Sequence, residues 1–254
     1  MLRNDKPFWL KNIGENVLDL LFPPRCIVCD ALLLPFKRQY LCDSCPKYFE
    51  PINQANVCQC GKPKTGTHCN TCKAPQTLLI TQNRAAFLYA DMPQELIYKF
   101  KFRKQPFVAY GLAQLMLSAV DDHVLRAADV IVPVPIHKKR LRARGFNQAT
   151  LLAKQLTKAL GIAPPKAVIR RAKNTKPLSG FSPKGRTNTL KDAFVLSGKY
   201  DVKGQSILLI DDIFTTGATL NACAKVLLDA GAKQVSALTF TVVVPKAKID
   251  KWNA

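Results

Sequence analysis

Acidic residues are scarce in this chain. Its 254 residues include 38 Lys and Arg against 17 Asp and Glu, which gives a formal charge of +21. No acid occurs between Asp129 and Asp192, whereas 15 Lys and Arg fall between Lys138 and Lys191. A charge excess of this size predicts a polyanionic partner or an anionic membrane surface.

Long apolar runs and the common nucleotide-binding motifs are also missing. Nothing resembling a signal peptide or an apolar span of about 18 residues precedes the cysteines, so we expect a cytoplasmic protein without a membrane span. The pattern G-x-x-x-x-G-K-[ST] is absent because Gly61 to Gly66 is followed by Thr67, and G-x-G-x-x-G is absent too. Nucleotide-binding loops of these two kinds are therefore excluded.

Residues 1–22 contain an amphipathic segment. Apolar residues recur at helical spacing from Phe8 to Phe22, which predicts a helix. The segment is short and carries little positive charge on its polar face, so packing on the rest of the protein is favoured over anchoring in a membrane. We predict an N-terminal amphipathic helix here.

Eight of the nine cysteines lie in pairs within a predicted domain over residues 23–76. Paired cysteines in a cytoplasmic chain indicate a metal site rather than disulfides. The first set has the spacing of a zinc ribbon, C-x2-C twice. The second set begins with C-x-C, which lacks the residue that lets backbone amides fold over the sulfurs. One or two structural zinc ions are expected, with ligands Cys26, Cys29, Cys42, Cys45, Cys58, Cys60, Cys69 and Cys72.

Two alternatives for the cysteines stay open. Pairing in sequence order is simpler than a cross-braced arrangement, but spacing does not decide between them. His68 could replace one cysteine as a ligand, although a histidine beside a knuckle is more often just exposed. The ninth cysteine, Cys223, lies inside a predicted helix and is expected to pack in the core.

After Pro75 the composition becomes that of a folded α/β domain, predicted over residues 77–254. Apolar runs typical of strands occupy Ala85–Ala90, Asp129–Pro135, Ile207–Ile210 and Gln234–Val244. Helices are expected at Pro93–Phe102, Phe107–Val120 and Phe146–Leu160, and a last helix is expected to open in the run Thr215–Thr219 and to continue to about Ala230. Asn147 is placed to cap the third of them. The first helix has a cationic edge at Lys99, Lys101, Arg103 and Lys104.

The stretch ILLIDDIFTTGATL, from Ile207 to Leu220, joins a strand to a helix. The strand reads as buried on both faces, which predicts a parallel sheet covered by helices, and it should end at Asp211 and Asp212. Glycine, threonine hydroxyls and the free N–H groups of a helix start suit a phosphate. Paired carboxylates suit a polyol or a divalent cation. Together these groups predict a pentose phosphate ligand.

This stretch resembles the phosphoribosyl pyrophosphate (PRPP) motif of type I phosphoribosyltransferases at every position. The resemblance implies that Asp211 and Asp212 hold the ribose hydroxyls, directly or through Mg²⁺, as the catalytic residues. It implies that the next residues hold the 5′-phosphate, namely Thr215, Thr216, Gly217, Ala218 and Thr219.

Two further segments fit that resemblance. The loop Ile136–Gly145 carries five cations and follows a strand, where the family presents the pyrophosphate, which implies roles for His137, Lys138, Lys139 and Arg140. The long basic stretch Ile169–Phe194 resembles the flexible loop that closes over PRPP and retains Thr175 and Arg186. It departs from the family pattern at Leu178, Gly185 and Thr189, which puts its closing chemistry in doubt.

The chain also contains three short motifs: VPVP at 132–135, RGFNQ at 144–148 and LA at 152–153. With these motifs and its cysteines, the chain resembles the ComF group, which includes the GntX branch. The resemblance runs from Cys26 to Val244. It implies a role in natural competence and DNA uptake, or in use of DNA as a nutrient, with competence-machinery proteins as possible partners.

Two functions remain open at this point. An enzyme would displace pyrophosphate from C1 of PRPP by positioning and charge stabilisation, without a protein nucleophile. A non-catalytic module would keep the fold to bind DNA or a nucleotide. The DNA partner is expected to be single-stranded and bound without sequence preference, with candidate contacts Arg142, Arg144, Arg170, Arg171 and Lys173.

Overall fold

The computed structural model describes residues 23–34, 39–64, 69, 72, 78–121, 123–173, 190 and 192–244. The chain forms two compact units, Met1–Phe49 and Glu50–Ala254. Within the described ranges, no helix is both long enough and apolar enough to cross a membrane. The amphipathic helix predicted over residues 1–22 lies outside the described residues.

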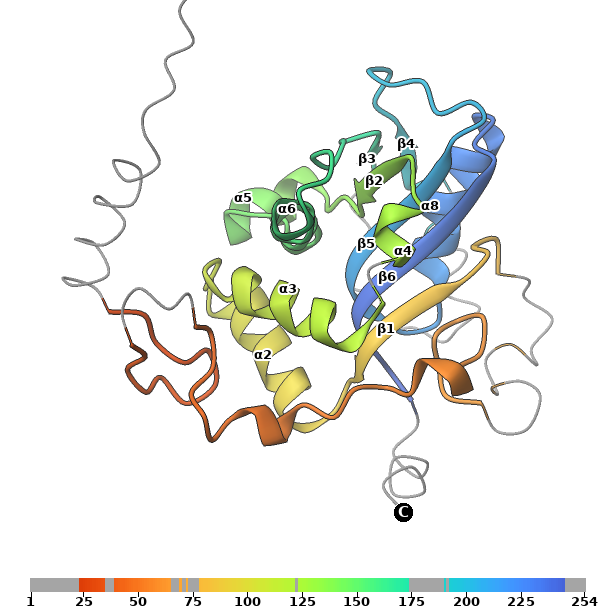
Figure 1. Ribbon diagram of the computed structural model, residues 1–254. Coiled ribbons are helices and arrows are strands. Elements are labelled where there is room, and N and C mark those ends of the chain that lie inside the picture. The colour runs from red at the N-terminus through yellow and green to blue at the C-terminus, as the bar shows by residue number, and fades with distance from the viewer. Residues whose placement is uncertain are drawn as a thin grey trace, which may run out of the picture. The chain divides into compact units, whose positions relative to one another are not determined.

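The larger unit is built on a parallel sheet, as the sequence predicts. Its four strands run in the order β1 (Asn83–Leu88), β6 (Gln234–Val242), β5 (Ser206–Phe214), β2 (Val130–Pro133), as Figure 1 shows. The two central strands are apolar on both faces because helices cover both. That double burial is the reason why they stand out in the sequence as unbroken apolar runs.

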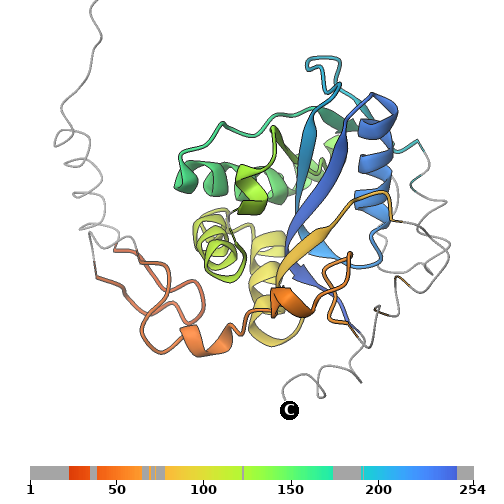
Figure 2. The ribbon, with the colours of Figure 1, turned by 45° about the vertical axis from the view of Figure 1, so that its right-hand side comes forward.

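Helices flank the two faces of this sheet (Figures 1 and 2). Helices α2 (Asp91–Phe102), α3 (Val108–Ala119) and α6 (Gln148–Leu160) cover one face, and α8 (Ala218–Asp229) covers the other. A single turn, α4 (His123–Arg126), precedes β2. Asn147 caps α6 as predicted, since its Oδ1 accepts from Ala149 N at 3.2 Å. Cys223 of α8 is fully buried, which confirms its expected place in the core.

Strand β5 continues past the acids where the sequence predicted its end. Asp211 and Ile213 lie opposite Thr239 and Thr241 of β6, so backbone pairing carries the strand to Phe214. In the sequence, two acidic residues after an apolar run indicate the end of a strand. The actual end depends on backbone pairing with the neighbouring strand, which the sequence does not show.

Two stretches predicted as loops contain regular structure. Within the basic loop Ile136–Gly145, residues Lys138–Arg144 form helix α5, because no Pro or Gly interrupts them and His137 Nδ1 accepts from Lys139 N at 3.2 Å. The ends of the long loop Ile169–Phe194 form an antiparallel pair, β3 (Ile169–Arg171) and β4 (Phe194–Leu196).

The compact units divide at Phe49, whereas composition places the boundary near residue 77. The short helix η1 (Pro46–Tyr48) closes the first unit, and η2 (Gln54–Asn56) lies in the second. Ile52 N donates to Ala86 O at 3.0 Å, and Asn83 N donates to Gln59 O at 2.7 Å. These bonds attach the second half of the cysteine-rich segment to β1, which explains the shifted division.

Candidate functional site

The loop Thr215–Gly217 joins β5 to α8 and forms the candidate phosphate site. Gly217 has φ +80°, and a Cβ there would lie 2.9 Å from Leu78 Cδ2 and 2.9 Å from Phe214 Cζ. Only glycine fits this left-handed, crowded position. The helix α8 that follows has no side-chain cap and no acid in its first turn. Its first N–H groups and positive dipole end therefore face the loop without a competing protein acceptor from a capping side chain.

The hydroxyl of Thr216 lies at the centre of this loop. Its Oγ1 is buried and has no hydrogen-bond partner within the described part of the chain. A buried hydroxyl without a partner costs free energy, about 1–3 kcal/mol by the usual measure. A bound anion that accepts from this hydroxyl would remove that cost, so the structure fits the predicted phosphate role of Thr216.

The two acids occupy adjacent positions in β5. Asp212 is buried, at 5% exposure, and its Oδ2 lies 2.9 Å from Nζ of Lys101 in α2. Asp211 is half-buried, and its Oδ1 accepts from Asp212 N at 2.9 Å. Burial first, and the charge of Asp212 second, raise the pKa of Asp211 to about 7, while Lys101 works in the opposite direction. Asp211 therefore ionises at a higher pH than an ordinary aspartate.

Cations from α5 and β3 surround the acids. Burial lowers the pKa of Arg144, whereas the nearby charge of Asp212 raises it. Its Nη1 also donates to Gln148 Oε1 at 2.5 Å. Burial likewise lowers the pKa of Arg171, and Arg140 lowers it further, while Cys223 and Asp211 raise it. The charge of Asp212 therefore acts on Arg144, and the charge of Asp211 acts on Arg171.

The predicted pyrophosphate residues lie at the start of α5. His137 and Arg140 are half-buried, whereas Lys138 and Lys139 are exposed. Desolvation, followed by Arg171 and the neighbouring α5 cations, lowers the pKa of His137. This ring is therefore neutral at physiological pH, and the positive field of the cations around it favours an anion at this position.

The remaining predicted site residues are exposed or lie outside the described residues. Arg142 and Arg170 are exposed, and Lys173 Nζ lies 3.6 Å from Asp192 Oδ2. Thr175 and Arg186 of the flexible loop fall outside the described ranges, as does His68. Sequence reasoning did not assign Lys101 to the site; its only signal was its place on the cationic edge of α2.

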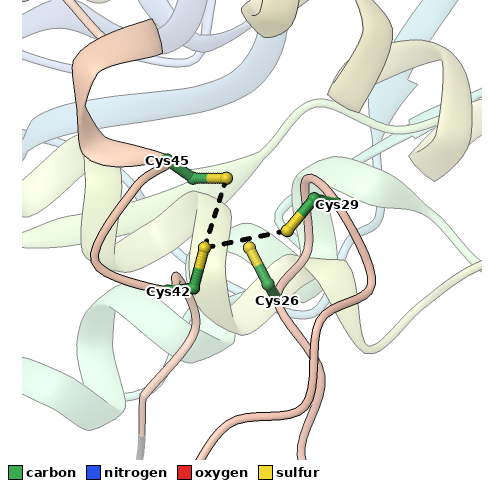
Figure 3. A group of neighbouring side chains, drawn as sticks. All are labelled: Cys26, Cys29, Cys42 and Cys45. Carbon is green, nitrogen blue, oxygen red and sulfur yellow. Dashed lines mark hydrogen bonds between the residues drawn. The ribbon is translucent and has the colours of Figure 1, made fainter.

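The first cysteine cluster brings Cys26, Cys29, Cys42 and Cys45 together, with their sulfurs directed toward one another (Figure 3). Cys29 Sγ lies 3.7 Å from Cys42 Sγ, which lies 3.5 Å from Cys45 Sγ. Tetrahedral zinc with bonds of about 2.3 Å separates its sulfurs by roughly 3.8 Å, whereas a disulfide needs about 2.05 Å. All nine cysteines are free thiols, so the spacing fits zinc.

The second cluster brings Cys58, Cys60, Cys69 and Cys72 together, with all four sulfurs within 4.8 Å of one another. Pairing in sequence order is thereby confirmed over a cross-braced arrangement. Gly61 supplies what the C-x-C pair lacks: at φ +77° its N–H donates to Cys58 O at 2.8 Å, and Cys58 N donates to Lys62 O at 2.8 Å. A left-handed glycine closes the knuckle in place of the missing residue.

The thiols within each cluster perturb one another. A hydrogen bond with Cys69, and burial second, raise the pKa of Cys60, while burial raises the pKa of Cys72 to about 12. Burial opposes ionisation of Cys26 too, but backbone hydrogen bonds prevail and lower its pKa to about 7. Clustered thiols ionise together only when a cation compensates them, so both donor sets fit zinc.

Two protein families match this chain. The phosphoribosyl transferase domain matches residues 128–253, and the double zinc ribbon domain matches residues 17–76. The first covers β2, α5, α6 and the β5–α8 loop, and the second covers both cysteine clusters.

Relatives match nearly the whole chain. Competence protein F of Haemophilus influenzae is 32% identical over 218 residues, covering 83% of this chain and 93% of that protein. Competence protein ComFC of Bacillus subtilis is 32% identical over 237 residues, covering 86% and 94%. DNA utilization protein YhgH of Escherichia coli is 30% identical over 226 residues, covering 85% and 96%. With its phosphoribosyltransferase fold and its two cysteine clusters, the chain belongs to the ComF/GntX family of competence and DNA-utilisation proteins.

Proposed function

We propose that this protein binds PRPP with Mg²⁺ at the β5–α8 loop and acts in the cytoplasm in the handling of DNA. The observation that carries the proposal is the buried Thr216 hydroxyl, which has no partner among the residues that the structure describes, beside a helix start that no side chain caps. Both features leave hydrogen-bond donors for an anion, and the left-handed Gly217 lets the backbone approach it closely. Nine free cysteines also suit a reducing compartment.

The proposed roles follow from the placement of each group. Residues Thr215–Thr219 would hold the 5′-phosphate, and Asp211 and Asp212 would hold the ribose side. The start of α5, residues 137–140, would hold the pyrophosphate through its positive field. Mg²⁺ usually takes one or two protein carboxylates and completes its shell with phosphate oxygens and water, which fits the two acids here. When bound, it would neutralise charge on the leaving pyrophosphate.

A role with DNA is supported by two observations of different kinds. The relatives carry the names competence protein and DNA utilization protein. The chain itself has a formal charge of +21, with its cations concentrated in the region that holds α5 and β3. Exposed Arg142 and Arg170 are candidate contacts to phosphates. Such contacts are independent of sequence and weaken with salt.

Calorimetry with Mg²⁺ and PRPP tests the proposed ligand. Asp212→Asn and Thr216→Ala should each weaken binding about ten- to a hundred-fold, the range for hydrogen bonds to charged groups. Thr81→Ala is the matched control, since its hydroxyl donates to Val235 O at 3.2 Å in a different part of the unit. A wild-type protein that shows no heat with PRPP in the presence of Mg²⁺ would contradict the proposal.

The alternative is a module that binds PRPP or a nucleotide without turnover. The ion pair of Asp212 with Lys101 favours the module without turnover. A buried carboxylate that is already paired with a lysine is not free to stabilise the positive charge that develops on the ribose during the reaction. Release of pyrophosphate from PRPP in the presence of a panel of nucleobase acceptors distinguishes the two. Release that Asp212→Asn abolishes supports the enzyme.

A further inference from the structure

Large aromatic side chains are exposed where α2 passes into α3. Tyr98 is 52% exposed, Phe102 is 62% exposed and Phe107 is 64% exposed. Tyr98 and Phe102 lie one helical turn apart with ring centroids 5.2 Å from each other. We call these three residues the aromatic platform. Exposed aromatic rings that gather in one place commonly mark a binding surface.

The aromatic platform is interleaved with cations. Residues 98–107 read YKFKFRKQPF and contain four Lys or Arg and no acid. Arg103 and Lys104 lie between Phe102 and Phe107 in the sequence, and both are exposed. Arg144 of α5 approaches from another element, with its Cζ 5.8 Å from the centre of the Phe102 ring. Positive charge therefore flanks the rings both along the chain and across from α5.

The platform also adjoins the candidate PRPP site. Lys101, next to Phe102 in sequence, makes the ion pair with Asp212, and the charge of Asp212 acts on Arg144. A ligand on the platform would therefore lie near elements that also form the candidate PRPP site, α2 and α5. A polymer with repeated aromatic faces and repeated negative charges matches both properties of this surface.

We propose that the aromatic platform stacks the bases of single-stranded DNA while Arg103 and Lys104 contact its phosphates. This inference rests on the proposed role in DNA handling and names the surface that would hold the expected single strand. Unpaired bases offer their faces to aromatic side chains, whereas a duplex hides them in its own stack. Cations at the rims supply the attraction that does not depend on sequence. An anionic peptide would use the cations but would leave the exposed rings without a counterpart.

Fluorescence anisotropy of a labelled oligothymidylate tests the platform. Phe102→Ala and Tyr98→Ala should each weaken binding by about five- to a hundred-fold, as for loss of one stacked base. Because stacking is not ionic, the slope of log K against log salt should stay unchanged in these variants. The double variant Arg103→Ala, Lys104→Ala should instead reduce that slope by about 0.7 for each lost phosphate contact.

Three measurements complete the design. Tyr200→Ala is the matched control: Tyr200 is an exposed tyrosine, at 41%, that lies near Lys166 rather than in the platform, so its loss should leave DNA affinity unchanged. Phe102→Trp should keep the affinity, and bound DNA should quench its fluorescence beyond the quenching of the unchanged chain. A duplex of the same sequence should bind more weakly than the single strand and should not respond to Phe102→Ala.

The outcomes separate this inference from the function on which it rests. If the wild-type protein binds the oligothymidylate and Phe102→Ala and Tyr98→Ala bind equally well, the platform is wrong while the role in DNA handling stands. Equal losses for duplex and single strand would also overturn stacking. If the wild-type protein binds no DNA, both fail. PRPP binding should be unaffected by Phe102→Ala. In the anisotropy assay, RNA of the same length serves as the single-stranded competitor.

Discussion

Each of the two cysteine clusters presents four thiols to a metal, but the two clusters are built into the chain in different ways. The first is formed by two local C-x2-C turns within Met1–Phe49, closed by bonds such as Asp30 N to Cys26 O at 2.9 Å. The second belongs to the unit that contains the parallel sheet, and Cys58, Cys60 and Cys69 are part of that unit's hydrophobic core. One cluster is a local staple, and the other is part of the compact unit that contains the parallel sheet.

Specific hydrogen bonds attach the second cysteine cluster to β1 and to the residues before it. Asn83 of β1 is fully buried, and its Nδ2 donates to Cys60 O at 3.1 Å. Gln59 Nε2 donates to Ile80 O at 2.7 Å. The knuckle that holds the metal thus shares its backbone bonds with the edge strand of the sheet. Zinc at this position should stabilise the sheet as well as the knuckle.

Contacts also connect this part of the chain with the candidate PRPP site. Leu78 and Phe214 close over Gly217, and Leu79 N donates to Asn221 Oδ1 in the first turn of α8 at 2.9 Å. Lys62, beside the second cluster, lies with its Nζ 5.8 Å from the centre of the Phe214 ring. The second cluster therefore contacts the elements that shape the phosphate loop.

Cys60→Ser, compared with Cys26→Ser, should have the largest effect. Structural zinc contributes on the order of 10 kcal/mol in small domains, which is comparable to the whole stability of a typical domain, about 5–15 kcal/mol. Cys60→Ser should therefore unfold the larger unit, whereas Cys26→Ser should leave its melting transition in place. Zinc analysis should find about two ions per wild-type chain. Equal melting losses in the two variants would contradict the proposed difference between the clusters.

Asn83→Ala should have the next largest effect. It leaves Cys60 O without its side-chain donor inside the core, at a cost of about 1–3 kcal/mol in the free energy of unfolding. Denaturant unfolding measures that loss. Asn53→Ala is the control, since exposed Asn53 only caps η2 by accepting from Ala55 N at 3.1 Å. If the two variants lose the same free energy, Asn83 does not link the cluster to the sheet.

A pH series of PRPP binding tests the role of Asp211. Because the pKa of Asp211 is raised from 3.8 to about 7, its carboxylate ionises only as the pH rises through 7. PRPP affinity with Mg²⁺ should therefore increase about tenfold from pH 6 to pH 8, as one ionisation requires. The folded state holds an extra proton between the two pKa values, so this group's contribution to stability falls as the pH rises across that window. Asp211→Asn should remove the pH dependence, and a wild-type affinity that is flat with pH would contradict it.

Several features were predictable from sequence because their causes are local. The apolar runs of β5 and β6 predict a buried parallel sheet, and Asn147 predicts a helix start. The cysteine spacing predicts the first metal cluster and leaves the second open. In each case the residues that form the feature are close together in the chain or share one periodicity. The geometry of Gly61 was not predicted, yet its signal was present as a glycine directly after the C-x-C pair.

Other features depend on contacts between distant segments. The ion pair of Lys101 with Asp212 joins α2 to β5, and no pattern in either segment indicates the other. The extension of β5 past Asp211 depends on pairing with β6. The bond from Asn83 to Cys60 depends on the knuckle lying against β1. Sequence periodicity carries no information about such pairs, so the link between the second cluster and the phosphate loop became visible only in the structure.

Leu78→Ala should have the smallest effect and tests that link most directly. Leu78 lies against Gly217, where it and Phe214 leave no room for a Cβ. Shortening it should cost about 1–2 kcal/mol of stability, below the range for a fully buried leucine because Leu78 is half-buried. The loosened loop should bind PRPP a few-fold more weakly by calorimetry. Leu79→Ala is the matched control, because it keeps the backbone bond to Asn221 and removes only an exposed side chain. If both variants bind PRPP as the wild type does, packing of Leu78 against Gly217 does not hold the loop.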